Sequence, residues 1–165
     1  TARILANTCQ ISLNDGSDVV LPTVARDWFY NADSSNRLLP ETDAGGTPFT
    51  IRVISCDVPP AGGTSQQNIH FQFTPQFGID PINKQVFSNN AASGKANNVG
   101  IVVFSGKYHT NALNSDGSSD VVYNLNGKDE PRFPAEYTFY ARYQNTGDVG
   151  NGVVVSNVVV NVTYQ

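Results

Sequence analysis

The last eight residues of the sequence, Val158-Val159-Val160-Asn161-Val162-Thr163-Tyr164-Gln165, show a regular alternation of side chains. One set of alternate positions carries only large apolar or aromatic side chains: Val158, Val160, Val162 and Tyr164. The intervening positions are mostly polar. Successive side chains of a β-strand point to opposite faces, so this alternation predicts a strand with one face buried in a core.

The same alternation recurs along the whole chain, with turn-forming residues between the segments and no convincing amphipathic helix. Turn signals include Asn14-Asp15-Gly16-Ser17 and Asn126-Gly127. About seven or eight short strands separated by turns are typical of a β-sandwich. We expect residues 26–46 to form a long connection with one helical turn, and residues 75–98 to be mostly loop with a short strand at 86–87. The other predicted strands lie at residues 4–13, 19–21, 49–56, 69–73, 99–104, 121–123 and 137–143.

Length and composition favour one extracellular domain rather than a cytosolic enzyme. The chain has 165 residues, 39% of them hydrophobic and only 15% charged, which predicts a single domain over residues 1–165. The net charge is −4 and the basic residues are scattered, so the clustered Lys and Arg of a nucleic-acid-binding surface are missing. No run of residues has the length and hydrophobicity of a membrane span. The absence of Met and of a signal peptide indicates a mature or trimmed product.

Cys9 and Cys56 are the two cysteines of the chain, and both lie in predicted strands. An internal disulfide can join only these two, and it would indicate an oxidising compartment such as a periplasm or a cell surface. The alternative is a pair of buried free thiols. A zinc site would have to recruit the lone His70 and His109, which do not have the close ligand spacing of such sites.

Motifs for catalysis and cofactor binding are not found. The chain contains no Gly-x-Ser-x-Gly nucleophile motif, and Gly94-Lys95 and Gly106-Lys107 lack the earlier glycine of a phosphate-binding loop. Residues 114–120 are rich in oxygen ligands but lack the bidentate Glu of an EF-hand calcium loop. His70 alternates away from its apolar neighbours, which favours a position at the solvent rim over a catalytic role. We therefore expect no enzymatic activity, no cofactor and no metal.

The aromatic trio Trp28-Phe29-Tyr30 stands out in an otherwise polar connection. Such a trio most often closes one end of a sandwich core. The alternative is a stacking platform that contacts a sugar ligand.

Several motifs, taken together and in order, resemble the pilins of bacterial chaperone–usher fimbriae of the type 1-like group. Each motif is weak alone, but their order and the cysteine spacing match over nearly the whole chain. The first-strand cysteine motif and the short strand after it correspond to Asn7-Thr8-Cys9-Gln10-Ile11 and Val20-Leu21-Pro22-Thr23-Val24. The second cysteine strand corresponds to Phe49-Thr50-Ile51-Arg52-Val53-Ile54-Ser55-Cys56. Three later motifs correspond to Ala96-Asn97-Asn98-Val99-Gly100-Ile101, Phe139-Tyr140-Ala141-Arg142-Tyr143 and the final strand with its penultimate Tyr164.

The resemblance implies an incomplete immunoglobulin-like β-sandwich that lacks its last strand and is completed by a donor strand. A periplasmic chaperone would lend that strand first, and another fimbrial subunit would replace it at the outer-membrane usher. The chain would then be a structural subunit of a fimbria on the bacterial cell surface, reached through the periplasm. The alternative is a fimbrial adhesin, or the pilin domain of one, that binds a host glycan or protein.

The resemblance also places the donor-strand groove on this sequence. Its edges would be residues 3–13 and 155–165, because these are the first and last strands. The residues expected to line it are Leu5, Ile11, Leu13, Phe139, Ala141, Val158, Val160, Val162 and Tyr164.

One departure from the family pattern concerns the segment before the first cysteine strand. Rod subunits carry an alternating apolar donor extension there, whereas only eight residues precede Cys9 in this sequence. We expect that the chain accepts a strand but does not donate one. Three explanations stay open: a trimmed sequence, the pilin half of a tip adhesin, or a naturally short extension.

Overall fold

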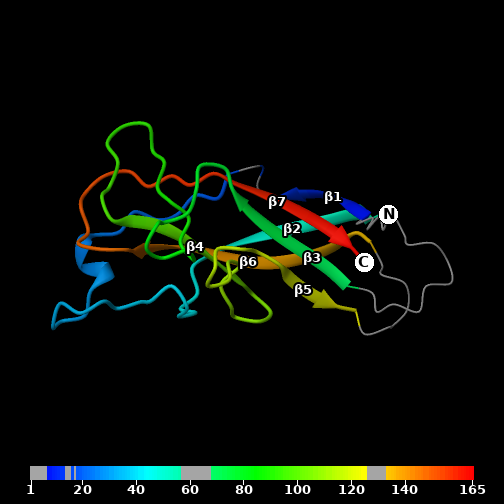
Figure 1. Ribbon diagram of the computed structural model, residues 1–165, viewed down its shortest axis with the longest axis horizontal. Coiled ribbons are helices and arrows are strands. Elements are labelled where there is room, and N and C mark those ends of the chain that lie inside the picture. Colours follow the sequence, from blue (N-terminus) through cyan, green and yellow to red (C-terminus); the bar gives the residue numbers. More distant parts are fainter. Residues whose placement is uncertain (1–6, 14–15, 17, 57–67, 126–132) are drawn as a thin grey trace.

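The computed structural model describes residues 7–13, 16, 18–56, 68–125 and 133–165, and it is all-β apart from one short 3-10 helix (Figure 1). That helix, η1 (Arg26–Phe29), is the helical turn expected in the long connection. Within these ranges the strands are β1 (Asn7–Leu13), β2 (Thr47–Cys56), β3 (Asn68–Pro75), β4 (Val99–Ser105), β5 (Val121–Asn124), β6 (Ala135–Asn145) and β7 (Val158–Tyr164). Each corresponds to a predicted strand, although several begin or end a few residues away.

The strands follow the order β4-β6-β2-β1-β7-β3-β5, and every pairing is antiparallel. β1 belongs to two sheets, because it pairs with β7 through Asn7 and Thr8 and then with β2 from Cys9 onward. The two sheets pack face to face: the rings of Phe71 and Phe73 on β3 lie 5.2 Å and 5.1 Å from the ring of Phe139 on β6. The predicted all-β fold is therefore confirmed.

Strand alternation places the core as the sequence predicts. On β3, Ile69, Phe71 and Phe73 are buried, whereas Gln72 is exposed. His70 lies on the outer face, where its Nδ1 is 2.8 Å from Asp120 Oδ1. Burial of such large apolar side chains is the main stabilising contribution of the fold, at about 1.5–3 kcal/mol for each.

The long connection between β1 and β2 covers the outer face of the sheet that contains β6. Arg142 and Gln144 reach this connection from β6: Arg142 Nη2 donates to the carbonyls of Leu39 (2.9 Å) and Thr42 (2.8 Å), and Gln144 Nε2 donates to Leu38 (2.9 Å). Burial lowers the pKa of the Arg142 guanidinium to about 10. An outward-facing arginine of a strand is thus buried by a loop that packs over it.

The segment between β3 and β4 is mostly loop, as predicted. The short strand expected at residues 86–87 is not one of the named strands. Phe87 instead forms isolated antiparallel bridges with Ile79 and Ile101, and its carbonyl accepts a hydrogen bond from the Ile101 amide at 3.0 Å. A loop stabilised in this way packs its Val86 and Phe87 side chains into buried sites.

Three connections lie at one end of the molecule. The connections that follow β1, β3 and β6 extend toward the end opposite the C-terminus (Figure 1). No helix in the described ranges is long and apolar enough to cross a bilayer.

Candidate functional site: an open strand edge

Among the residues that the structure describes, one edge of β7 has no partner strand over most of its length. β7 pairs with β3 along all seven of its residues. On its other side it pairs with β1 only at Tyr164 and Thr163. Within the described part of the chain, residues 158–162 therefore present unpaired backbone groups on the β1 side, and we call them the open edge. Unpaired strand edges are templates for the addition of another strand.

A second unpaired segment follows β1. In residues 18–24, no backbone amide or carbonyl makes a backbone hydrogen bond to any other described residue. The side chains nevertheless alternate as in a strand, since Val19 and Leu21 pack on the main core whereas Val20 is 82% exposed. This segment has the side-chain pattern of a strand without a hydrogen-bonded neighbour.

The side chains beside these unpaired segments are half-buried and apolar. They pack against the main core yet keep part of their surface exposed: Ile11, Leu13, Val19, Leu21, Val158 and Val160. Partial exposure of so many apolar groups is the condition that an added strand would relieve, because each square ångström of apolar surface removed from water stabilises by roughly 25 cal/mol.

The residues predicted to line the groove fall into three sets. Ile11, Leu13, Val158 and Val160 are half-buried at the periphery of the core. Leu5 lies outside the described residues. Four others are buried within the core itself: Phe139, Ala141, Val162 and Tyr164.

Val19 and Leu21 were not among the groove residues predicted from the sequence. The signal that could have found them is their spacing around the exposed Val20, which is the alternation of a short strand.

A cavity of about 310 Å³ lies near the ends of both unpaired segments. Thr23 and Val24 line it from the segment after β1, and Val153 and Val154 line it from the chain that leads into β7. Phe29 and Val99 contribute further apolar surface. Polar residues complete the lining, among them Arg26 and Asn151.

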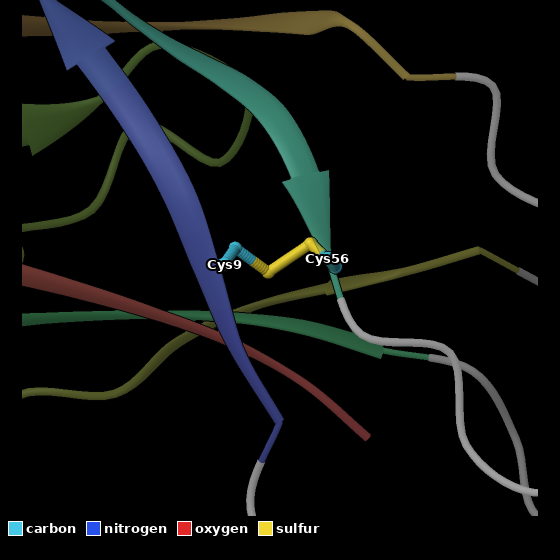
Figure 2. Close-up of a disulfide and its surroundings, with 2 residues drawn as sticks. All are labelled: Cys9 and Cys56. Atoms are coloured by element: carbon cyan, nitrogen blue, oxygen red, sulfur yellow. A yellow bond between two sulfur atoms is a disulfide. The ribbon is translucent and has the colours of Figure 1, made fainter.

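The predicted disulfide is present and fixes the strand that changes sheets. Cys9 on β1 and Cys56 at the end of β2 are direct cross-strand partners, with their Cα atoms 4.1 Å apart (Figure 2). Cys9 is also the first residue of β1 that pairs with β2 instead of β7. The covalent link therefore holds β1 against β2 at the point where it leaves β7.

The aromatic trio closes the loop end of the sandwich. Phe29 is buried in a small cluster with Ala96, Val99 and Val149, and Trp28 and Tyr30 are half-buried beside it. The guanidinium of Arg37 lies 4.4 Å from the centre of the Trp28 ring, so it covers one face of the indole.

The described residues show no arrangement suited to catalysis by a metal. No group of three or more His, Cys, Asp or Glu side chains gathers within the described ranges. In the stretch considered for calcium, Asp116 Oδ1 accepts hydrogen bonds from the amide (2.9 Å) and the hydroxyl (2.6 Å) of Ser118. These bonds lower the pKa of the Asp116 carboxyl. They join residues two positions apart, as in a local turn.

Taken together, these features describe a disulfide-linked β-sandwich whose last strand is, among the described residues, unpaired along most of one edge. Comparison with known proteins identifies the family. The family model described as "Fimbrial protein" matches residues 1–165. The chain belongs to the fimbrial protein family.

Two curated relatives agree with this assignment. The chain is 29% identical over 172 residues to the uncharacterized fimbrial-like protein YadK of Escherichia coli (strain K12). This alignment covers 99% of the present chain and 82% of YadK. It is also 29% identical over 167 residues to the minor fimbrial subunit HifD of Haemophilus influenzae. That alignment covers 96% of the present chain and 68% of HifD.

Among solved structures, the chain is similar to the CupB6 tip adhesin from Pseudomonas aeruginosa, with a TM-score of 0.47 and 17% sequence identity. The match covers 74% of this chain but only 32% of the adhesin, so the chain spans about a third of that protein.

Membership of the family gives the chain its general role. It is a fimbrial protein, part of a surface appendage that assembles from fimbrial subunits.

Proposed function

We propose that this chain is a structural, non-enzymatic fimbrial subunit whose single domain is completed by a donor strand inserted along the open edge. The observation that carries the proposal is the unpaired backbone of residues 158–162 next to the half-buried Val158 and Val160. An added strand would hydrogen-bond to this edge, and its alternate side chains would cover the exposed apolar surface.

The donor strand would come from two partners in turn. A periplasmic chaperone would supply it first, and a segment of another fimbrial subunit would replace it at the outer-membrane usher. The disulfide is consistent with passage through an oxidising periplasm, since such bonds persist there and are rare in the cytosol.

The unpaired backbone of residues 18–24 supports the same proposal. Its alternating side chains already have the orientation of a strand, and its backbone groups have no partner in the described part of the chain. A donor strand that runs beside β7 would offer hydrogen bonds to this segment as well. Insertion is therefore expected to convert residues 18–24 into a regular strand.

The test is thermal unfolding of the purified chain with a synthetic donor peptide. The peptide is long enough to pair with the seven residues of β7, and Val and Ile alternate with Thr and Ser along it. A control peptide has the same composition in scrambled order. We expect only the alternating peptide to raise the Tm, because only it presents all its apolar side chains to one face. Equal Tm values with both peptides would refute strand acceptance.

A further inference from the structure

A second cavity, of about 370 Å³, is lined by residues of the loops that Figure 1 shows at the end of the molecule opposite the C-terminus. Three segments line it: the connection after β1, the loop after β3 and the turn after β6. Loops held by a rigid β scaffold are frequent places for ligand binding. None of the residues of the open edge lines this cavity, so it is separate from the proposed donor groove.

The polar groups around this loop cavity are only partly used inside the protein. Asp80 Oδ2 accepts hydrogen bonds from the amides of Ile82 and Asn83, and Asn36 Oδ1 accepts one from Asn145. Asn83 Oδ1 accepts a hydrogen bond from the Gln85 amide. Four further polar atoms around the cavity make no hydrogen bond within the described part of the chain: Asp80 Oδ1, Asn36 Nδ2, Asn83 Nδ2 and the Thr146 hydroxyl. The cavity thus offers both acceptors and donors to a ligand.

Apolar surface lies beside these polar groups. Ile82 is 89% exposed and Leu39 is 48% exposed, and both line the cavity together with Pro40 and Tyr30. Large apolar side chains left in water at the rim of a cavity mark a contact surface. A ligand that fits must therefore present apolar C–H groups as well as hydroxyl groups.

The charges around the cavity restrict the ligand further. No Lys or Arg is among the residues that line it, whereas Asp80 and Asp148 are. The nearby Arg26 is paired with Asp148 at 2.5 Å. A ligand with a carboxylate or phosphate group would be repelled by Asp80 and would meet no Lys or Arg among the described residues that line the cavity. A neutral ligand with many hydroxyl groups is favoured.

We infer that the loop cavity binds a neutral pyranose sugar. The hydroxyl groups of the sugar would donate to the carboxylates and accept from the Asn36 and Asn83 amides, and its C–H surface would contact Tyr30, Leu39 and Ile82. A volume of about 370 Å³ is within the range of ligand-binding sites. A fimbrial subunit with such a site would contribute directly to recognition of a surface glycan.

Saturation-transfer NMR on the full chain tests this inference. The probes are the methyl glycosides of glucose, galactose, mannose and N-acetylglucosamine, with methyl glucuronide and N-acetylneuraminic acid as acidic comparisons. At least one neutral glycoside is expected to give a signal, and the acidic sugars are expected to give none. Absence of any signal from the neutral glycosides, or equal binding of the acidic sugars, would overturn the inference.

Two substitutions and their matched controls place the binding in the cavity. Ile82→Ser removes an apolar contact with the glycoside, and Thr146→Val removes a hydroxyl that can hydrogen-bond to it. Each substitution alone should weaken binding of the glycoside by about threefold to tenfold. Phe77→Ser and Thr74→Val alter exposed residues outside the cavity and should leave binding unchanged. If all four variants bind alike, the sugar does not occupy this cavity.

The experiment also separates this inference from strand acceptance. Sugar binding is measured with and without the donor peptide, and we expect it in both cases because the cavity and the open edge share no residue. Sugar binding without a peptide-induced rise in Tm would refute only the proposed function. A rise in Tm without sugar binding would refute only the sugar site.

Discussion

Val160 on β7 is paired with Phe73 of β3 on one side and, within the described residues, has no strand partner on the other. Its side chain packs against the main core but remains partly exposed. Its neighbour Val159 points to the opposite face and is 47% exposed. The same substitution at Val160 and at Val159 can therefore separate an effect on binding of a donor strand from an effect on the stability of β7 itself.

Val160→Asp should abolish most of the rise in Tm that the alternating donor peptide produces, because a carboxylate at this position would be buried without a partner once the peptide is bound. Val159→Asp is the matched control, since it places the same charge on the solvent face of the same strand. Thermal unfolding with and without peptide measures both effects. A peptide-induced shift that is equally large in the two variants would contradict the proposed position of the groove.

The disulfide should contribute strongly to stability. Replacing Cys9 and Cys56 together by Ser is expected to lower the free energy of unfolding by about 2–5 kcal/mol, the usual cost of removing a native disulfide from a small secreted domain. Urea unfolding of the variant and of the parent chain gives this difference. The parent chain with reductant should behave like the variant, and an unchanged midpoint in reductant would count against a structural role of the bond.

Arg142→Ala should destabilise the domain by about 2–4 kcal/mol, because it removes the guanidinium's hydrogen bonds to the carbonyls of Leu39 and Thr42 and leaves the buried Gln144 Oε1 without this donor. Arg52→Ala is the control, since Arg52 is an exposed arginine on β2, the neighbouring strand. That change should stay within about 0.5 kcal/mol. Urea unfolding compares the two variants, and equal midpoints would show that the loop does not depend on Arg142.

Ionisation of the Tyr137 hydroxyl should contribute to a loss of folding stability in alkaline solution. Burial, with a smaller contribution from Tyr123, raises the pKa of Tyr137 above its ordinary value of 10.0 in the folded state. The unfolded chain therefore loses this proton at lower pH than the folded chain, so the stabilising contribution is complete below about pH 10 and is lost as the pH rises above it.

Tyr137→Phe isolates this effect, because phenylalanine has no proton to lose. The difference in unfolding midpoint between the parent chain and the variant should change as the pH is raised from about 9 to about 11, with the parent losing more stability. Tyrosinate absorbance followed over the same range should show delayed ionisation in the folded parent. Parallel loss of stability in both proteins would mean that Tyr137 does not contribute.

Much of the local structure could be predicted from the sequence because it depends on neighbouring residues. The alternation around His70 correctly placed Ile69, Phe71 and Phe73 in the core, and the helical turn in the long connection was also predicted. The disulfide could be proposed because the chain has only two cysteines. These predictions depend on a strand period of two and on the pairing chemistry of thiols, both of which are visible in the order of residues.

The strand order and the burial of particular side chains were decided by the tertiary structure. Arg142 alternates outward on β6, and only the loop that packs over it makes it buried. The loop cavity joins residues from three segments that are far apart in the sequence. The alternation of residues 158–165 determined that they form a strand with one apolar face. Which of its edges remains unpaired depends on where β1 leaves β7 for β2, because edge pairing is a relation between distant segments that side-chain periodicity does not encode.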